Sequence, residues 1–189
     1  MISPEHRRQL LEVARESLLC GVHSGHPLEV SPAEHATELQ QAGACFVTLH
    51  EDGALRGCIG SLEAHRPLVV DVAENAFAAG FRDPRFQALR EAELERVSIS
   101  ISVLSKPVAM DFSSEQDLLK QLRVGIDGLV LEAGYHKGTF LPAVWAQLPQ
   151  PEQFLRHLKR KAGLAEDYWA DNIHISRYQS ESFDEHSAA

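Results

Sequence analysis

The sequence contains few cysteines and no long apolar run, and each shortage excludes a class of protein. Its three cysteines, Cys20, Cys45 and Cys58, are an odd number at wide spacing without a CxxC pair, which excludes a disulfide framework and a cysteine metal site. No apolar stretch approaches the roughly 18 uncharged residues of a membrane-spanning helix. The first residues lead into a polar helix and lack the pattern of a signal peptide. We therefore expect a cytoplasmic protein with reduced thiols and no membrane contact.

Positive charge is scarce as well. The chain carries 18 lysines and arginines against 27 acidic residues, a formal net charge of -9. Binding to nucleic acid requires a concentrated basic surface, so we do not expect nucleic acid as a partner. One basic run, Arg156 to Lys161, could hold an anion or an acidic partner, but charge on the solvated face of a helix is commonplace.

The elements that the sequence does contain indicate an α+β protein. Its 189 residues, 44% apolar and 24% charged, suit one ordinary globular domain or two closely packed halves. Helices are predicted from Ser3-Pro4 to Gly21, from Ser31-Pro32 to about Gly43, from Pro67 onward, after the Ser114 cap, and over 152–162. Strands are predicted at 45–50, 55–60, 97–104, 129–132 and 173–178. Strands and helices are mixed without a regular βαβ alternation, which favours α+β over a parallel sheet.

The first two strands form a predicted hairpin around the segment LRGCIG, Leu55 to Gly60. A three-residue connection, Glu51-Asp52-Gly53, places the apolar residues of both strands on one buried face. That face comprises Cys45, Val47, Leu49, Leu55, Gly57 and Ile59. A two-residue Asp52-Gly53 turn would instead put Arg56 on the apolar side, so we prefer the longer connection.

Arg56 and Cys58 are the strongest candidates for chemistry. Being two residues apart on a strand, they project from the same face. A guanidinium beside a thiol favours the thiolate, and Gly57 and Gly60 remove side-chain bulk around it. The alternative is structural: free cysteines are commonly buried, and glycines also permit close helix packing.

The sequence does not identify a general base for this thiol. His50, on the same hairpin face, and His65, in the following loop, are the candidates, and each also fits an ordinary surface histidine. The histidines of the polar loop 23–26, with His35, lack the carboxylate or cysteine spacing of a metal site. We expect no metal and no cofactor.

A second candidate segment is Asp83-Pro84-Arg85-Phe86, at the end of the helix that Pro67 begins. As a structural device, Asp83 caps the turn at Pro84 and Arg85 pairs with an acidic neighbour. As a functional device, Arg85 holds an anionic substrate in a bidentate contact, through two parallel hydrogen bonds from its guanidinium.

Six ordered motifs give the chain a family resemblance. They are FVTL (46–49), LRGCIGS (55–61), RDPRF (82–86), ISVLS (101–105), GTFLP (138–142) and KRKAGL (159–164). Together they resemble the AMMECR-domain family, in particular its prokaryotic branch, over about Leu10 to Phe183. The resemblance implies an AMMECR-type fold, a single domain over residues 1–189 made of two interlocked α+β subdomains with mixed or antiparallel sheets and a cleft between them.

The resemblance also implies site residues and partners, but no reaction. The residues associated with the family's cleft are Arg56, Gly57, Cys58, Gly60, Asp83 and Arg85. The prokaryotic branch belongs to the AmmeMemoRadiSam system, which also contains Memo-like and radical SAM proteins.

Two functional hypotheses remain open. In the first, the protein is a thiol-dependent enzyme or carrier in which Cys58 is the reactive thiolate, Arg56 and Arg85 orient a small anionic substrate, and Gly57, Gly60 and Asp83 line the binding site. In the second, the same segment shapes a non-catalytic surface for the Memo-like or radical SAM partner.

Overall fold

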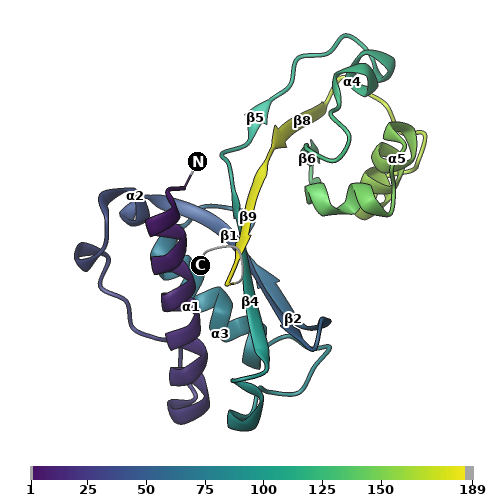
Figure 1. The fold of residues 1–189 in the computed structure, drawn as a ribbon. Helices are drawn as coiled ribbons and strands as arrows, with labels where there is room; N and C mark the ends of the chain where they lie inside the picture. The colour runs from purple at the N-terminus through teal and green to yellow at the C-terminus, as the bar shows by residue number, and fades with distance from the viewer. Residues whose placement is uncertain (1, 186–189) are drawn as a thin grey trace. The chain divides into compact units, whose positions relative to one another are not determined.

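The structure is a computed structural model that describes residues 2–185. The chain divides into two compact units, each with its own apolar core (Figure 1). The first unit runs to Leu104 and resumes at Glu181, and the second is Ser105–Ser180. Helices are mixed with antiparallel sheets, which confirms the α+β class. The single-domain assignment and the cleft stay predictions.

The first unit places two long helices against an antiparallel sheet. Its elements are α1 (Pro4–Ser24), the 3₁₀ turn η1 (Pro32–Glu34), α2 (Thr37–Gln40), β1 (Ala42–Glu51), β2 (Ala54–Gly60), β3 (Arg66–Pro67), α3 (Leu68–Phe81), η2 (Glu91–Glu93), β4 (Val97–Leu104) and β9 (Ser180–Asp184). The strand order is β2-β1-β4-β9, with β3 paired to the start of β1. Strand β2 is therefore an edge strand. Helix α3 packs on β1 and β2, with α1 beside it (Figure 1).

The caps of α1 confirm its predicted start but not its end. The Ser3 hydroxyl accepts a hydrogen bond from the His6 amide, and Pro4 occupies the first turn. The helix continues past Gly21 to Gly25, which adopts the left-handed conformation at φ 76°. A side chain at Gly21 would lie 2.3 Å from the Phe81 ring, so this glycine serves the packing of α1 against α3.

The second predicted helix is also shorter than expected. The segment from Ser31 to Gly43 contains only η1 and the single turn α2, and β1 already begins at Ala42. Proline at residue 32 opens a 3₁₀ turn that ends at His35, where the backbone becomes extended.

The hairpin between β1 and β2 has a shorter turn than the sequence indicated. Asp52 and Gly53 both have positive φ, at 51° and 80°, which is the two-residue turn that we did not prefer. The register then shifts by one residue, because His50 pairs with Leu55 and Leu49 pairs with Gly57. Arg56 is the extra residue of this β-bulge.

A two-residue turn without a bulge would place Arg56 on the apolar face. The extra residue at the bulge restores the predicted face for the residues that follow it. Beyond it, Val47 pairs with Ile59 and Leu49 with Gly57, so the predicted apolar face is right for these four residues. Leu55 lies before the bulge and is 42% exposed, so its predicted burial was wrong. On the opposite face, Ser98, Ser100 and Ser102 of β4 pair with His50, Thr48 and Phe46 of β1.

The second unit packs two helices against a smaller antiparallel sheet. Its elements are β5 (Val108–Ala109), α4 (Glu115–Gln121), β6 (Gly128–Ala133), β7 (His136–Phe140), the 3₁₀ turn η3 (Pro142–Ala146), α5 (Pro151–Lys161) and β8 (Ile173–Tyr178), with strand order β5-β8-β6-β7. The Ser114 hydroxyl caps α4 through the Asp117 amide, as predicted. No helix in residues 2–185 is long and apolar enough to cross a membrane.

The basic run on α5 is less available than a solvated face would be. Lys159 is fully buried, and its ammonium lies 2.8 Å from the Glu115 carboxylate. Arg156 and Arg160 both pair with Glu166. Two carboxylates of the unit thus offset half of the four positive charges that would attract an anion.

Candidate functional site

The orientation of Cys58 follows from the glycine before it. A Cβ atom at Gly57 would lie 2.1 Å from the Ala79 carbonyl oxygen of α3, closer than any side chain tolerates. Glycine is therefore needed where α3 crosses β2. Because successive strand residues point to opposite faces, Cys58 faces away from the helix and is half-buried.

Gly60 is explained in a similar way. A Cβ atom there would lie 2.3 Å from the Phe46 ring and 2.6 Å from the Cys45 carbonyl oxygen. Both glycines of the motif thus leave room for the protein's own atoms. Any ligand contact at Gly57 or Gly60 would involve their backbone atoms.

The backbone of Cys58 is held on the open side of β2 by the DPR segment. The Cys58 amide donates to Asp83 Oδ2 at 2.9 Å, and Arg85 Nη2 donates to the Cys58 carbonyl at 3.4 Å. The two side chains also bind each other, with Arg85 Nε 2.9 Å from Asp83 Oδ1 and Nη2 2.7 Å from Oδ2. Asp83 and Arg85 therefore satisfy the backbone amide and carbonyl of Cys58, which a neighbouring strand would otherwise pair with at the edge of the sheet.

Asp83 remains ionised although its side chain is only 2% exposed. The Arg85 guanidinium holds the pKa of this carboxyl well below its usual range, and the amides of Cys58 and Arg85 lower it further against the effect of burial. The structural prediction that Asp83 caps the turn is confirmed by its Oδ1, which accepts from the Arg85 amide at 3.1 Å.

Cys58 has Thr48 beside its sulfur and Arg85 beside its backbone. Thr48, directly across the β1–β2 ladder, donates its hydroxyl hydrogen to Cys58 Sγ at 3.3 Å. The Arg85 guanidinium reaches the Cys58 carbonyl, and its bond to Asp83 raises the pKa of Arg85. Arg85 is 53% exposed and can meet a solute. We call Thr48, Cys58, Asp83 and Arg85 the Cys58 site.

Arg56 is engaged elsewhere. Its Nε donates to Glu93 Oε1 at 2.8 Å and its Nη2 to the Gln87 carbonyl at 3.0 Å. Only 11% of the side chain is exposed. The Arg56 guanidinium lowers the pKa of Glu93 to about 2, with the Arg90 amide contributing. The guanidinium also lies over the Phe86 ring, at 5.9 Å from its centroid.

The remaining thiols and the two candidate bases lie outside this arrangement. Burial raises the pKa of the Cys45 thiol, and the nearby Asp71 carboxylate raises it further. Within residues 2–185, neither His50 nor His65 forms a hydrogen bond or ion pair with Cys58, and His65 is 3.9 Å from Glu63. In the same part of the chain, no cluster of three or more histidine, cysteine or acidic side chains is arranged to hold a metal.

Sequence reasoning missed several residues that shape the site. Thr48 is not singled out by the sequence, and it lies opposite Cys58 only because the bulge shifts the register. Glu93 follows Arg56 by 37 residues and carries no local signal of the pair. Beside the site, the buried Asp71 accepts hydrogen bonds from the Cys45 amide and the Ser61 hydroxyl and so fixes the end of the motif.

Fold and site together define an α+β protein with a half-buried thiol on an edge strand. A model of the AMMECR1 family matches residues 11–183, so the chain belongs to that family. Protein MJ0810 of Methanocaldococcus jannaschii is 36% identical over 145 residues, 75% of this chain and 72% of that protein. Protein SSO0193 of Saccharolobus solfataricus is 37% identical over 191 residues, 97% of this chain and 83% of that one.

A solved structure shares the fold. The crystal structure of an uncharacterized protein, PH0010 from Pyrococcus horikoshii, is similar with a TM-score of 0.80. The two chains are 30% identical, and the similarity covers 95% of this chain and 91% of that chain.

Proposed function

We propose that the Cys58 site is a thiol site for a small anionic electrophile, so that the protein acts as a thiol-dependent enzyme or carrier. The observation that carries the proposal is the position of Arg85. Its guanidinium is half-exposed and donates to the Cys58 carbonyl at 3.4 Å, so it lies beside the residue that carries the thiol. A cation in that position stabilises a thiolate and attracts an anionic group.

In the proposed step, the Cys58 thiol loses its proton to solvent and the sulfur lone pair attacks an electrophilic carbon of the substrate. A covalent S–C bond forms, and the leaving group departs with the electrons of the bond that breaks. The Thr48 hydroxyl donates to the sulfur while it is negatively charged. Arg85 binds the anionic group of the substrate.

Within this proposal the two arginines of the sequence hypothesis have different roles. Arg85 supplies the exposed charge, whereas Arg56 is held by Glu93 and Gln87 and fixes the bulge before Cys58. Arg56 is thus a positioning residue. Asp83 is also a positioning residue, because its carboxylate holds both the Cys58 amide and Arg85.

Alkylation of the intact protein near neutral pH tests the proposal. Labelling with iodoacetamide, followed by peptide mapping, should modify Cys58 faster than a model cysteine peptide and much faster than the buried Cys45. Cys58→Ser should remove this labelling with little change in melting temperature. Cys58 reacting no faster than the model peptide, or a large loss of stability in Cys58→Ser, would favour a packing role.

A second candidate function is a non-catalytic interaction surface for the Memo-like and radical SAM proteins of the AmmeMemoRadiSam system. It is favoured by two exposed apolar side chains, Leu55 at the start of the motif with 42% exposure and Leu62 directly after it with 39%. Co-purification with those partners that survives the double change Cys58→Ser and Arg56→Gln would support it. Loss of co-purification in Leu55→Ser with Leu62→Ser would locate the contact.

A further inference from the structure

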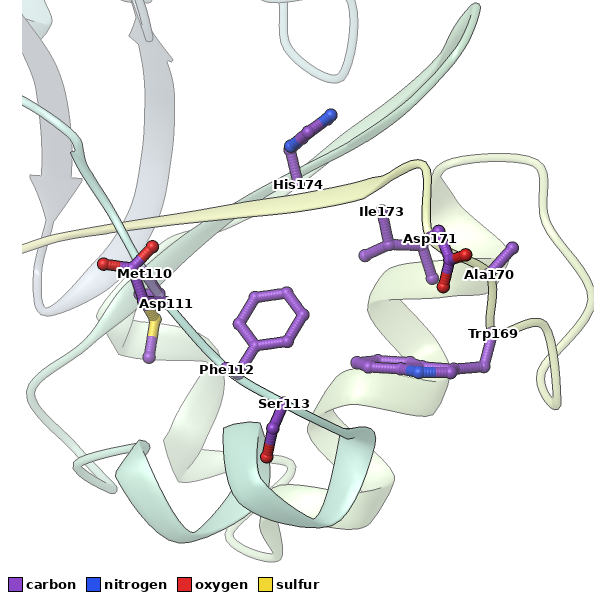
Figure 2. A pocket seen from close by; sticks show the side chains of 9 residues that line it. All are labelled: Met110, Asp111, Phe112, Ser113, Trp169, Ala170, Asp171, Ile173 and His174. Atoms are coloured by element: carbon purple, nitrogen blue, oxygen red, sulfur yellow. The ribbon is translucent and has the colours of Figure 1, made fainter.

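The second unit contains a cavity that the proposed function does not use. Its volume is about 270 Å³, and segments 110–113 and 169–174 form its walls (Figure 2). Pockets for drug-sized ligands occupy about 300–1,000 Å³, so this cavity suits one side chain or a small amine. All of its lining residues belong to the second unit.

Two aromatic side chains form the apolar part of the cavity. The Phe112 ring and the Trp169 indole lie 5.6 Å apart between centroids, at an interplanar angle of 54° (Figure 2). Both are half-buried and pack against the core of the unit with their other side. The indole already attracts one cation, because the Lys159 ammonium lies 5.4 Å from its centroid.

The charge of the lining is negative. Asp171 is an exposed lining residue on the segment of Trp169, and Asp111 is exposed beside Met110 on the other wall (Figure 2). His174 also lines the cavity, but no lysine or arginine does. In the part of the chain that the structure describes, neither carboxylate forms a hydrogen bond or ion pair through its side chain. By contrast, Glu115, Asp127 and Glu132 of the same unit each pair with a lysine or arginine.

The combination points to one class of ligand. Aromatic faces bind the flat or methylene part of an organic cation, and the free carboxylate of Asp171 binds its charged group. Lys159 does not oppose such a ligand strongly, because Glu115 neutralises it at 2.8 Å. We propose that this cavity binds an organic cation, a guanidinium or alkylammonium group, supplied either by a free amine or by a basic side chain of another protein.

The test uses the whole protein and two pairs of probes. Agmatine is compared first with N-butylurea, a neutral compound of similar length that lacks both positive charges of agmatine. Calorimetry and the fluorescence of Trp169 measure binding, and the second tryptophan, Trp145, is buried. We expect agmatine to bind with a dissociation constant on the order of 1 mM and the neutral probe at least about tenfold more weakly. Next, an acetylated and amidated Gly-Arg-Gly peptide is compared with its citrulline counterpart.

Variants locate the binding. Asp171→Asn should weaken agmatine binding about fivefold and Trp169→Phe severalfold, because each removes one attractive group. Asp167→Asn is the matched control, since this aspartate lies outside the lining.

Five results decide the proposal and the source of the ligand. Tighter binding of the arginine peptide than of agmatine identifies a protein side chain as the ligand, and the reverse identifies a free amine. Equal binding of charged and neutral probes would overturn the proposal. So would the absence of saturation up to about 30 mM agmatine, or an unchanged affinity in both Asp171→Asn and Trp169→Phe.

Discussion

The two arginines near Cys58 have the same type of partner but different surroundings. Each binds a carboxylate, Glu93 for Arg56 and Asp83 for Arg85, and each lies over the Phe86 ring. Arg56 is 11% exposed and Arg85 is 53% exposed. A buried guanidinium is committed to its partner, whereas an exposed one retains donors for a solute. Under the proposed function, this difference in exposure favours fold maintenance for Arg56 and ligand contact for Arg85.

Replacing Gly57, the glycine before Cys58, should change the free energy of unfolding most. This substitution tests whether packing against α3 fixes the direction of the thiol. Gly57→Ala places a methyl group where the Ala79 carbonyl lies, and we expect a loss of about 3 kcal/mol in the free energy of unfolding. Urea denaturation measures it. Ala54→Ser, at an exposed position of the same strand, is the control and should change stability by less than about 0.5 kcal/mol. A fully stable Gly57→Ala protein would contradict the close approach of α3.

Replacing each arginine in turn tests the comparison itself. Arg56→Gln leaves the Glu93 charge largely buried and should cost about 2 to 3 kcal/mol of unfolding free energy. Arg85→Gln should cost clearly less than Arg56→Gln, because solvent can reach the Asp83 carboxylate once the exposed guanidinium is gone. Equal losses in the two variants would remove the distinction between them.

The acid sensitivity of the Arg56 pair gives a smaller effect with a definite sign. The pKa of Glu93 is lowered from 4.5 to about 2 in the folded protein, so its contribution is complete above about pH 4.5 and is lost as the pH falls toward 2. The stability difference between the wild type and Glu93→Gln should therefore shrink over that interval. Unfolding curves at several pH values measure it, and a difference that stays constant or grows would contradict the assignment.

Thr48 gives the smallest predicted effect. Thr48→Val keeps the shape of the side chain but removes the hydrogen bond to Cys58 Sγ. We expect alkylation near neutral pH to slow about fivefold, since a hydrogen bond of this kind contributes about 1 kcal/mol. Thr48→Ser should restore most of the rate, and Ser100→Ala, one strand further on, should leave it unchanged. Equal rates in Thr48→Val and the wild type would show that the hydroxyl does not stabilise the thiolate.

The contrast between the arginines also shows what the sequence can predict. Period-two alternation in 45–50 and 97–104 identified the sheet and its buried face correctly, because every second residue of a strand faces the core and is apolar. The turn at Asp52-Gly53 could not be separated from a longer one by composition. The bulge at Arg56 follows from that turn and from the crossing of α3, which is a tertiary contact.

The site was predictable in its residue types but not in its pairing. Arg56, Cys58, Asp83 and Arg85 were all candidates, yet a two-residue spacing suggested Arg56 as the cationic neighbour of the thiol. No local pattern in the sequence indicated that the chain returns to the first sheet as strand β9. None indicated that Glu93 is the buried partner of Arg56. Partners distant along the chain are decided by packing, which local periodicity does not encode.

The most direct test of the account compares two alkylating reagents of similar size, anionic iodoacetate and neutral iodoacetamide. In the wild type, the rate of Cys58 with iodoacetate divided by its rate with iodoacetamide should exceed the same ratio for a model cysteine peptide. Arg85→Gln should lower the ratio about threefold, and Arg56→Gln should leave it unchanged, because only the exposed guanidinium meets the reagent. A ratio unaffected by Arg85→Gln, or lowered equally by Arg56→Gln, would contradict the central claim that Arg85 provides the anion contact beside Cys58.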